Sequence, residues 1–365
     1  MQAARAAGLR PAAIDLFGDE DTLACAARTV TLAPQTGLRF PRAALRDALG
    51  SLRAVAGEAP IVWGSGFEGD PATLLMLEAS APVLGCSAAA RTALSDPWAF
   101  AATLAALGLA HPPVARARPD DTARWLLKRR GAAGGAHVRE APPGARVPPG
   151  CYVQRHVAGR SLSAAFLAAR DDVRLLGIAE HLSLQHAPGA PFRYGGAIGA
   201  AAVSSPVRDR VAHAVRVLCR AHGLVGLCGM DFVLDREEEI TILEVNPRPT
   251  ATFDLLTEPG AALAAHLALC RGGSAPDLPP VDAPRGHAVL YAARPARVPK
   301  AIDWPRWVCD RPRALTAIPQ GAPVCSVAAG GADVPAVRRR LGARFAWLAR
   351  FVHAFEPGAR SRGSE

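Results

Sequence analysis

Two oxygen-bearing side chains stand at alternate positions at the end of the predicted β-strand ITILEVN (240–246). Side chains alternate across a strand, so Glu244 and Asn246 are expected on the same face as the two isoleucines before them. Arg248 follows two residues later, after a proline. A strand that simply runs out into solvent would explain the two polar side chains equally well, so the preceding segment has to decide.

A predicted β-hairpin places a second carboxylate opposite Glu244. The segment GMDFVLDREEEITILEVNP (229–247) has two strand-like runs joined by the turn-like REEE. A register that pairs Asp235 with Ile240 places Asp231 opposite Glu244, counted in steps of two residues. Like charges that face each other on a sheet repel, and a bound cation explains their pairing better. Two carboxylates and an amide oxygen predict Mg²⁺ or Mn²⁺.

The composition favours a folded protein that binds small anions. The chain has 365 residues, 50% of them hydrophobic, and a mean hydropathy of +0.12. No stretch reaches the length and apolarity of a membrane span, so we expect no membrane association. The net charge of +10 is spread along the chain and aromatic residues make up only 5%, which disfavours a nucleic-acid partner. Only Lys128 and Lys300 are lysines, which slightly favours a specific role for each.

Eight cysteines are scattered along the chain without a Cys-x-x-Cys unit. This spacing supports neither a zinc site nor a redox motif. Scattered cysteines in an enzyme-sized chain are typical of buried thiols in a reducing compartment, so we expect a cytoplasmic protein.

The first part of the chain has an α/β pattern. Helices and strands are predicted to alternate, which favours a parallel sheet: a helix at 1–8, a strand at 12–17, an acidic turn GDEDT, a helix at 41–56, a strand at 60–64, a helix at 71–79 and a strand at 82–85. The loop Gly64–Glu68 follows a strand and precedes a helix, where α/β proteins bind ligands, although a plain tight turn is the simpler interpretation.

A well-marked helix begins after residue 94, where Ser95 or Asp96 is the expected cap, Pro97 fits the first turn and Gly108 ends the helix. The remaining elements are inferred from their patterns: strand, glycine loop and strand over 123–140, a strand at 151–157, helices at 162–169 and 205–222, a β-rich region from 280, a helix at 334–354 and a disordered tail PGARSRGSE.

In their order along the chain, LLKRRGAAGGAHV, CYVQRHVAG and GMDFVLD…ILEVNPR resemble the ATP-grasp superfamily. They are similar to its strand lysine and mobile phosphate-covering loop, its adenine hinge and its metal hairpin. The resemblance implies an α/β (α+β) ATP-grasp fold. Its expected units are a preceding Rossmann-like α/β domain at 1–90, the ATP-grasp domain at 91–280 and a β-rich C-terminal extension with its tail at 281–365.

The resemblance implies a role for each matching residue. The nucleotide would be held by the strand lysine, the glycine loop and the hinge, whose backbone would read adenine: Lys128, Gly131, Gly134, Gly135, Gln154, Arg155, His156 and Val157. The metal, most simply two Mg²⁺ ions bridged by Glu244, would be held by Asp231, Glu244 and Asn246. Arg248 and Arg193 would contact the transferred phosphoryl group or a substrate carboxylate. From the residues alone, a surface lysine, a flexible hairpin loop and an exposed turn at Arg193 remain alternatives.

The sequence departs from the family pattern in three places. Pro97 stands where many members carry a lysine, Gln154 where a glutamate is common, and the first strand is missing, which suggests a native start upstream. His181 and His186 are spaced poorly for ligands on one helix face, so we expect both to be structural.

The C-terminal segment resembles predicted carboligases through the residues LYAARPARVPKAIDWPRWVCDRP. These carboligases are distantly similar to biotin carboxylase and to tyramine–glutamate ligase of methanofuran-type cofactor synthesis. It implies an ATP-dependent ligase that joins a small carboxylate, such as glutamate, to an amine through an acyl phosphate. A homodimer is a possible assembly. The alternative is a regulatory protein that binds ATP or a metabolite without turnover.

Overall fold

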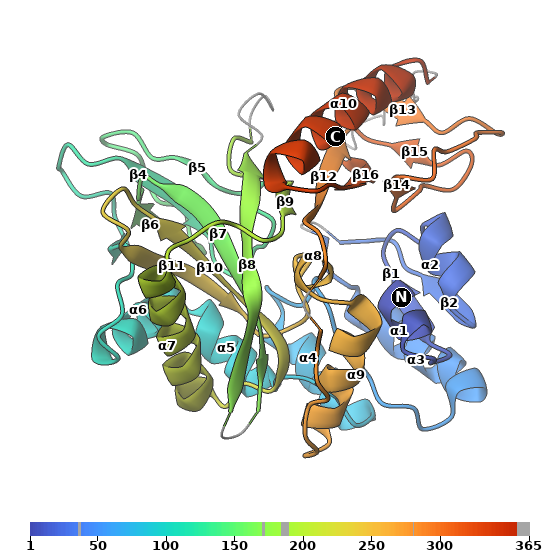
Figure 1. The fold of residues 1–365 in the computed structure, drawn as a ribbon, viewed down its shortest axis with the longest axis horizontal. Helices are drawn as coiled ribbons and strands as arrows, with labels where there is room; N and C mark the ends of the chain where they lie inside the picture. Colours follow the sequence, from blue (N-terminus) through green and yellow to red (C-terminus); the bar gives the residue numbers. More distant parts are fainter. Residues whose placement is uncertain (36–37, 170–171, 184–189, 280, 356–365) are drawn as a thin grey trace.

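The computed structural model describes residues 1–35, 38–169, 172–183, 190–279 and 281–355. Its N-terminal part is a small α/β unit (Figure 1). The elements of this part are α1 (Gln2–Ala6), β1 (Ala12–Asp15), α2 (Glu20–Cys25), β2 (Arg28–Thr31), α3 (Arg42–Ala56), α4 (Pro71–Ser80) and α5 (Ala88–Ser95). β1 and β2 pair in parallel, as the alternating pattern predicts.

Local sequence signals explain most of these elements. Asp19 accepts a hydrogen bond from the Thr22 N–H at 2.8 Å and caps α2, so the acidic segment expected to be a turn is a helix. The strands expected at 60–64 and 82–85 are reduced to one parallel bridge between Ile61 and Val83. The α-helix α5 was not predicted at all.

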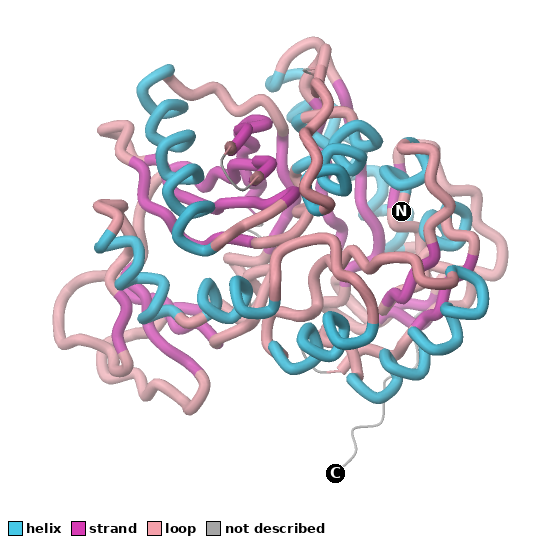
Figure 2. The backbone as a smooth tube through the Cα atoms, turned by 90° about the horizontal axis from the view of Figure 1, so that it is seen from below, coloured by secondary structure: helices cyan, strands magenta, loops and turns pink. Residues whose placement is uncertain are grey.

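A four-stranded sheet with the order β3-β6-β4-β5 follows the N-terminal unit. Its elements and the helix before them are α6 (Pro97–Ala106), β3 (Val114–Ala115), β4 (Trp125–Arg129), β5 (Arg139–Glu140) and β6 (Cys151–Arg155). Asp96 caps α6 through the N–H groups of Trp98 and Ala99, and Gly108 has φ +67° just after its end, as predicted. Figure 2 shows long loops extending beyond the strands of this sheet.

The largest sheet has eight strands in the order β11-β10-β7-β8-β9-β12-β16-β14. The elements from its first strand onward are β7 (Arg160–Ala168), β8 (Val173–Ser183), β9 (Tyr194–Ile198), α7 (Ser205–His222), β10 (Gly226–Leu234), β11 (Ile240–Asn246), α8 (Phe253–Leu256) and α9 (Pro259–Cys270). The helix predicted at 162–169 is wrong, because this segment is strand β7. Its alanines are good helix formers, but β7 pairs with β10 on one side and β8 on the other.

Helices cover parts of both faces of this sheet (Figure 1). Leu162 and Phe166 of β7 pack with Val211 and Leu218 of α7, in a core that extends into α4, α5 and α6. The opposite face packs against α8 and α9, in two smaller clusters. The alternation of β7 and β10 therefore separates a fully apolar face from one that also carries polar side chains.

Strands from the last part of the chain continue the same sheet, because β12 pairs with β9 and β16 pairs with β12. The elements are β12 (Arg285–Tyr291), β13 (Ala296–Arg297), β14 (Val308–Cys309), β15 (Ala317–Ile318), β16 (Pro323–Gly330) and α10 (Val334–His353). The β-rich pattern and the closing helix agree with these elements, and the tail predicted to be disordered lies outside the described residues. The division into three domains remains a proposal.

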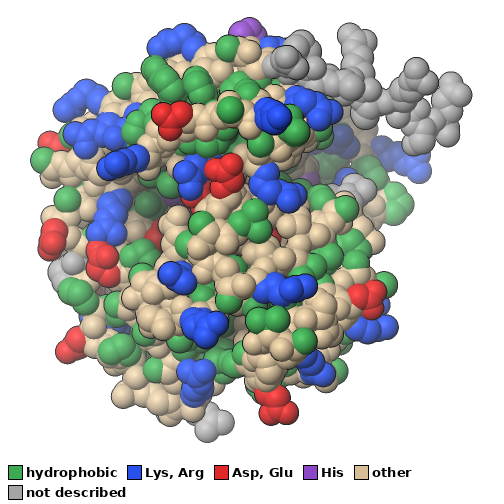
Figure 3. All heavy atoms as spheres, turned by 90° about the vertical axis from the view of Figure 1, so that its right-hand side faces the viewer, with side chains coloured by type: hydrophobic (Ala, Val, Ile, Leu, Met, Phe, Trp, Pro, Cys, Tyr) green, Lys and Arg blue, Asp and Glu red, His purple; other side chains and the backbone are tan. Residues whose placement is uncertain are grey.

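No helix within the described ranges is long and apolar enough to cross a membrane. On the face shown in Figure 3, basic side chains are scattered among acidic and apolar ones rather than gathered in one continuous stripe.

Candidate active site

A cleft lies between the four-stranded sheet, the end of β11 and the N-terminal helices. The cleft is lined by these residues from the sequence-based prediction: Lys128, Gly131, Gln154, Glu244 and Asn246. Segments more than a hundred residues apart thus contribute to one cavity.

The hairpin predicted to hold the metal forms, but with a different register than expected. Leu234, not Asp235, pairs with Ile240, and a β-bulge at Leu243 then restores the pairing of Asp231 with Glu244. The bulge also changes the face on which the last residues lie. Ile240, Ile242 and Val245 all belong to the apolar core, so Glu244 and Asn246 are not on the isoleucine face, as predicted, but on the opposite one.

The two paired carboxylates influence each other strongly. Burial, together with the charge of Glu244, raises the pKa of Asp231 to about 6. Burial also acts to raise the pKa of Glu244, but Lys128 and the Asn246 amide outweigh it, so this pKa is lowered. A divalent cation between the two acids would relieve their repulsion.

The donor set fits Mg²⁺ by its chemistry. It consists of two carboxylates and one amide, all of which are oxygen ligands. The described part of the chain contains no group of three or more His, Cys, Asp or Glu residues arranged to hold a metal. The Asn246 amide nitrogen donates to Glu244 Oε1 at 3.2 Å. The Asn246 oxygen accepts from Arg248 Nη2 at 3.4 Å, so the amide links the carboxylate to the arginine.

Lys128 faces this pair from the other side of the cleft. Its Nζ donates to Gln154 Oε1 at 2.9 Å, and the amide nitrogen of Gln154 lies 3.3 Å from His111 Nε2. Burial and the charge of Lys128 lower the pKa of His111 to about 4, so its neutral ring can accept the amide hydrogen. Burial also lowers the pKa of Lys128, while Glu244 and Asp231 oppose this shift. Neither the position of Gln154 as a bridge nor the role of His111 was predicted.

The glycine loop is held between two other segments. Gly131, Gly134 and Gly135 have φ values of 62°, 72° and 71°, which only glycine adopts readily. Gly131 packs against the backbone of Glu68, and a Cβ atom there would lie 2.7 Å from the Glu68 carbonyl oxygen. On the far side, the carbonyl of Gly134 accepts a hydrogen bond from the Tyr194 N–H at 2.9 Å.

The adenine hinge is only partly free to bind a base. The N–H of Arg155 donates to the Pro113 carbonyl and that of His156 to the Arg124 carbonyl. If the hinge reads adenine, it must therefore do so through other backbone groups, including those of Val157.

Arg248 enters the site through a partner that sequence reasoning missed. Its Nε and Nη2 lie 2.9 Å and 2.7 Å from Glu68 Oε1, and both side chains are largely buried. The other carboxylate oxygen, Glu68 Oε2, accepts the Gly66 N–H at 2.7 Å. The loop Gly64–Glu68, which the sequence marked only as a weak ligand loop, thus holds the arginine that follows the metal hairpin.

The cleft lining also lacks these predicted site residues: Asp231, Gly134, Gly135, Arg155, His156, Val157 and Arg248. Arg193 does not line the cleft either. Its Nη1 donates to the Gly321 carbonyl at 2.8 Å, and its guanidinium lies 4.6 Å from the centre of the Tyr291 ring. His181, expected to be structural, lies on β8 with Nε2 3.9 Å from Asp231 Oδ1, next to the metal pair. His186 lies outside the described residues.

Comparison with known proteins identifies the domain. Residues 94–252 match the family model of the ATP-grasp domain. No curated protein sequence matches the chain significantly. The matched residues include all three motifs on which the resemblance to the ATP-grasp superfamily rests.

Solved structures extend the likeness to nearly the whole chain. A biotin carboxylase from Campylobacter jejuni superposes with a TM-score of 0.71 at 13% identity, over 93% of this chain and 86% of that one. L-amino acid ligase from Bacillus licheniformis gives 0.67 at 14% identity, over 93% and 97%. N5-carboxyaminoimidazole ribonucleotide synthetase from Thermus thermophilus gives 0.67 at 17% identity, over 100% and 96%. At these identities the likeness confirms the ATP-grasp fold.

Proposed function

We propose that the protein is an ATP-dependent carboxylate–amine ligase that forms an amide through an acyl phosphate. The observation that carries this proposal is that Glu244, the strand partner of Asp231, lines the same cleft as Lys128. A cation that reaches into the cleft and a pair of acids that repel each other suit a metal-bound nucleotide triphosphate. The names of the structural neighbours, which include an amino acid ligase and carboxylases, support the same class of reaction.

The proposed reaction has two steps. A carboxylate oxygen of the first substrate attacks the γ-phosphorus of ATP, the bond to the β–γ bridging oxygen breaks, and ADP leaves with that electron pair. The nitrogen of the amine then attacks the carbonyl carbon of the acyl phosphate, loses a proton, and expels inorganic phosphate. The products are therefore ADP, phosphate and an amide.

The residues of the chain position and neutralise the reacting groups. Lys128 is held by Gln154 with its ammonium group directed into the cleft, where it would contact phosphate oxygens. Asp231, Glu244 and Asn246 would hold Mg²⁺, which when bound neutralises phosphate charge. Arg248, fixed by Glu68, would orient the carboxylate or stabilise the transferred phosphoryl group. The glycine loop would exclude water above the phosphates.

Calorimetry with ATP in the presence and absence of Mg²⁺ tests nucleotide binding, and chromatography of the products tests the reaction. We expect binding that requires Mg²⁺, and ADP with phosphate as products. Equal ATP affinity without metal would contradict the metal site, and AMP as the stoichiometric product would contradict activation by γ-phosphoryl transfer.

A narrower proposal concerns the substrates and rests on the resemblance of the C-terminal segment to carboligases of one-carbon metabolism. Glutamate would be the acid and an aromatic amine such as tyramine or tyrosine the other substrate, on the way to a furan-type one-carbon carrier. ADP release measured over a panel of acids and amines tests this proposal. A different productive pair would refute the assignment of substrates but not the ligase.

A regulatory ATP-binding protein is the second candidate, and Pro97 in the cleft wall, where a cation is common in relatives, is the observation in its favour. If ATP binds with Mg²⁺ but no acid–amine pair releases ADP, this second candidate replaces the first.

A further inference from the structure

Arg91 is an arginine of the cleft to which the sequence analysis assigned no role. It lies on the buried side of α5 and is 9% exposed. It lines the same cleft as Glu244 and Asn246, although it is more than 150 residues away from them in the sequence. A buried arginine needs either internal partners or a ligand, because its charge cannot be removed at ordinary pH.

The internal partners of Arg91 are few. Its Nη2 donates to the backbone carbonyl of Glu68 at 3.1 Å, the one hydrogen bond of this side chain among the residues that the structure describes. None of its nitrogen atoms belongs to the buried polar atoms that lack a partner, so the remaining donors are accessible from the cleft. A guanidinium has five N–H donors, and most of those of Arg91 are therefore available to a ligand.

The carboxylate nearest to Arg91 already has other partners. The carboxylate of Glu68 is already engaged by two donors of Arg248 and by the Gly66 N–H, so Arg91 has only its backbone carbonyl. Burial lowers the pKa of Arg91, and Arg248 adds to this effect, whereas Glu68 and Glu244 oppose it. Two arginines that share one carboxylate beside the metal pair form a place where a further anion is stabilised.

The position of Arg91 also indicates which part of a ligand it meets. The charges that act on it are those of Glu68, Arg248 and Glu244, whereas Lys128 is bound to Gln154 on the four-stranded sheet. If Glu244 holds the metal at the reacting end of the nucleotide, Arg91 lies at that end too.

We propose that Arg91 contacts the terminal phosphate of the bound nucleotide, and the acyl phosphate formed from it, beside Arg248. The inference rests on the proposed function, since it assumes that a nucleotide triphosphate occupies the cleft. It adds a phosphate-binding residue from the N-terminal unit and explains why a guanidinium with a single hydrogen bond in the described part of the chain is buried beside the cleft.

The test compares the affinities of MgATP and MgADP by calorimetry, because only MgATP carries the terminal phosphate. Arg91→Met is expected to weaken MgATP binding about tenfold and MgADP binding less than about twofold, as for the loss of a charge-assisted hydrogen bond. Arg91→Lys keeps the charge but not the fork, so an intermediate loss is expected. Arg46→Met, an exposed arginine of α3, is the matched control for the loss of a positive charge and should change neither affinity.

Equal weakening of MgATP and MgADP, or unchanged MgATP binding, would overturn the inference and leave the proposed function intact. Thermal unfolding identifies a variant that does not fold. If Arg91→Met is such a variant, the MgATP-to-MgADP ratio of Arg91→Lys decides the question in the same way. A wild-type protein that binds no MgATP would overturn the proposed function, and this inference with it.

Discussion

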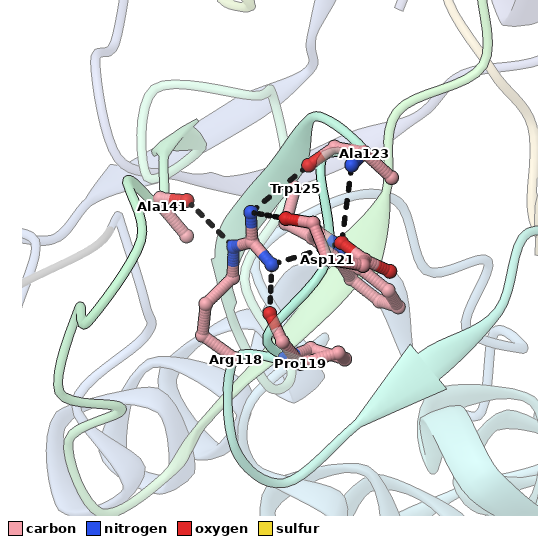
Figure 4. A network of polar contacts seen from close by, with 6 residues as sticks. All are labelled: Arg118, Pro119, Asp121, Ala123, Trp125 and Ala141. Atoms are coloured by element: carbon pink, nitrogen blue, oxygen red, sulfur yellow. Dashed lines mark hydrogen bonds and ion pairs between the residues drawn. The ribbon is translucent and has the colours of Figure 1, made fainter.

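Arg118 and Arg91 both bury a guanidinium, but their surroundings differ. Arg118, whose side chain is 4% exposed, donates to the carbonyls of Ala141, Asp121, Ala123 and Pro119 and to the Asp121 carboxylate (Figure 4). Arg91 has one hydrogen bond within the described part of the chain. The first arginine is surrounded by acceptors, and the second faces a cleft.

The difference separates an arginine that builds structure from one that is available for binding. Asp121 completes the network of Arg118 by accepting the N–H of Ala123 and the indole N–H of Trp125, so the loop before β4 is fixed to the segment after β5. This network supports the strand that carries Lys128, without contributing a group to the cleft. In the cleft, the charges remain partly unsatisfied, as expected of a site that binds ions.

Substitution of Glu244 is expected to have the largest effect and tests the binding role of the cleft. Glu244→Gln removes one charge from the proposed metal pair while keeping its shape. Turnover is expected to fall at least about 100-fold and MgATP binding to lose its dependence on Mg²⁺, with the fold unchanged. ADP release and calorimetry measure these effects. A fully active variant would mean that the hairpin does not hold the metal.

The structural side is tested at Arg118. Arg118→Met leaves several buried carbonyls without a donor, and the free energy of unfolding is expected to fall by about 3 kcal/mol. Urea unfolding measures it. The ratio of MgATP to MgADP affinity should stay as in the wild type, and a change in this ratio as large as that expected for Arg91→Met would erase the distinction between the two arginines.

The contact between the glycine loop and the Glu68 loop gives a smaller effect. Gly131→Ala would place a Cβ atom 2.7 Å from the Glu68 carbonyl oxygen and 2.8 Å from Gly69 Cα. Gly134→Ala is the matched control, because its φ is also positive but no atom lies within 4 Å of the added carbon. We expect MgATP binding to weaken about tenfold more in the first variant than in the second. Equal effects would show that strain, not the contact, matters.

His111 gives the smallest effect, which appears only in acid. Its pKa in the fold is about 4, below the ordinary 6.5, so between these values the unfolded chain binds a proton that the folded protein does not. The contribution of the neutral ring to stability is complete above pH 6.5 and is lost as the pH falls toward 4. The free energy of unfolding lost through His111 is about 2 kcal/mol at pH 5. His111→Gln should therefore lose less stability than the wild type between pH 7 and pH 5 in urea unfolding. An identical loss would contradict the shifted pKa.

The sequence by itself determined the features that depend on neighbouring residues. Asp96, Pro97 and Gly108 delimit α6 as predicted, because caps and helix ends are set by local hydrogen bonds and by φ preferences. The three motifs identified the ATP-grasp domain, since each is a short pattern of residue types. The pairing of Asp231 with Glu244 was also predicted, although the predicted register was wrong by one residue and a bulge offsets the error.

Tertiary packing decided the rest. The alanine-rich segment 162–169 is a strand because two neighbouring strands satisfy its backbone, which outweighs its helix propensity. The alternation of side chains along a strand does not predict the bulge at Leu243. The face on which Glu244 lies was therefore predicted wrongly, whereas its strand partner Asp231 was predicted correctly. Glu68 and Arg248 are 180 residues apart, and no local pattern links them. Their contact exists only because the fold brings a loop of the N-terminal unit against the metal hairpin.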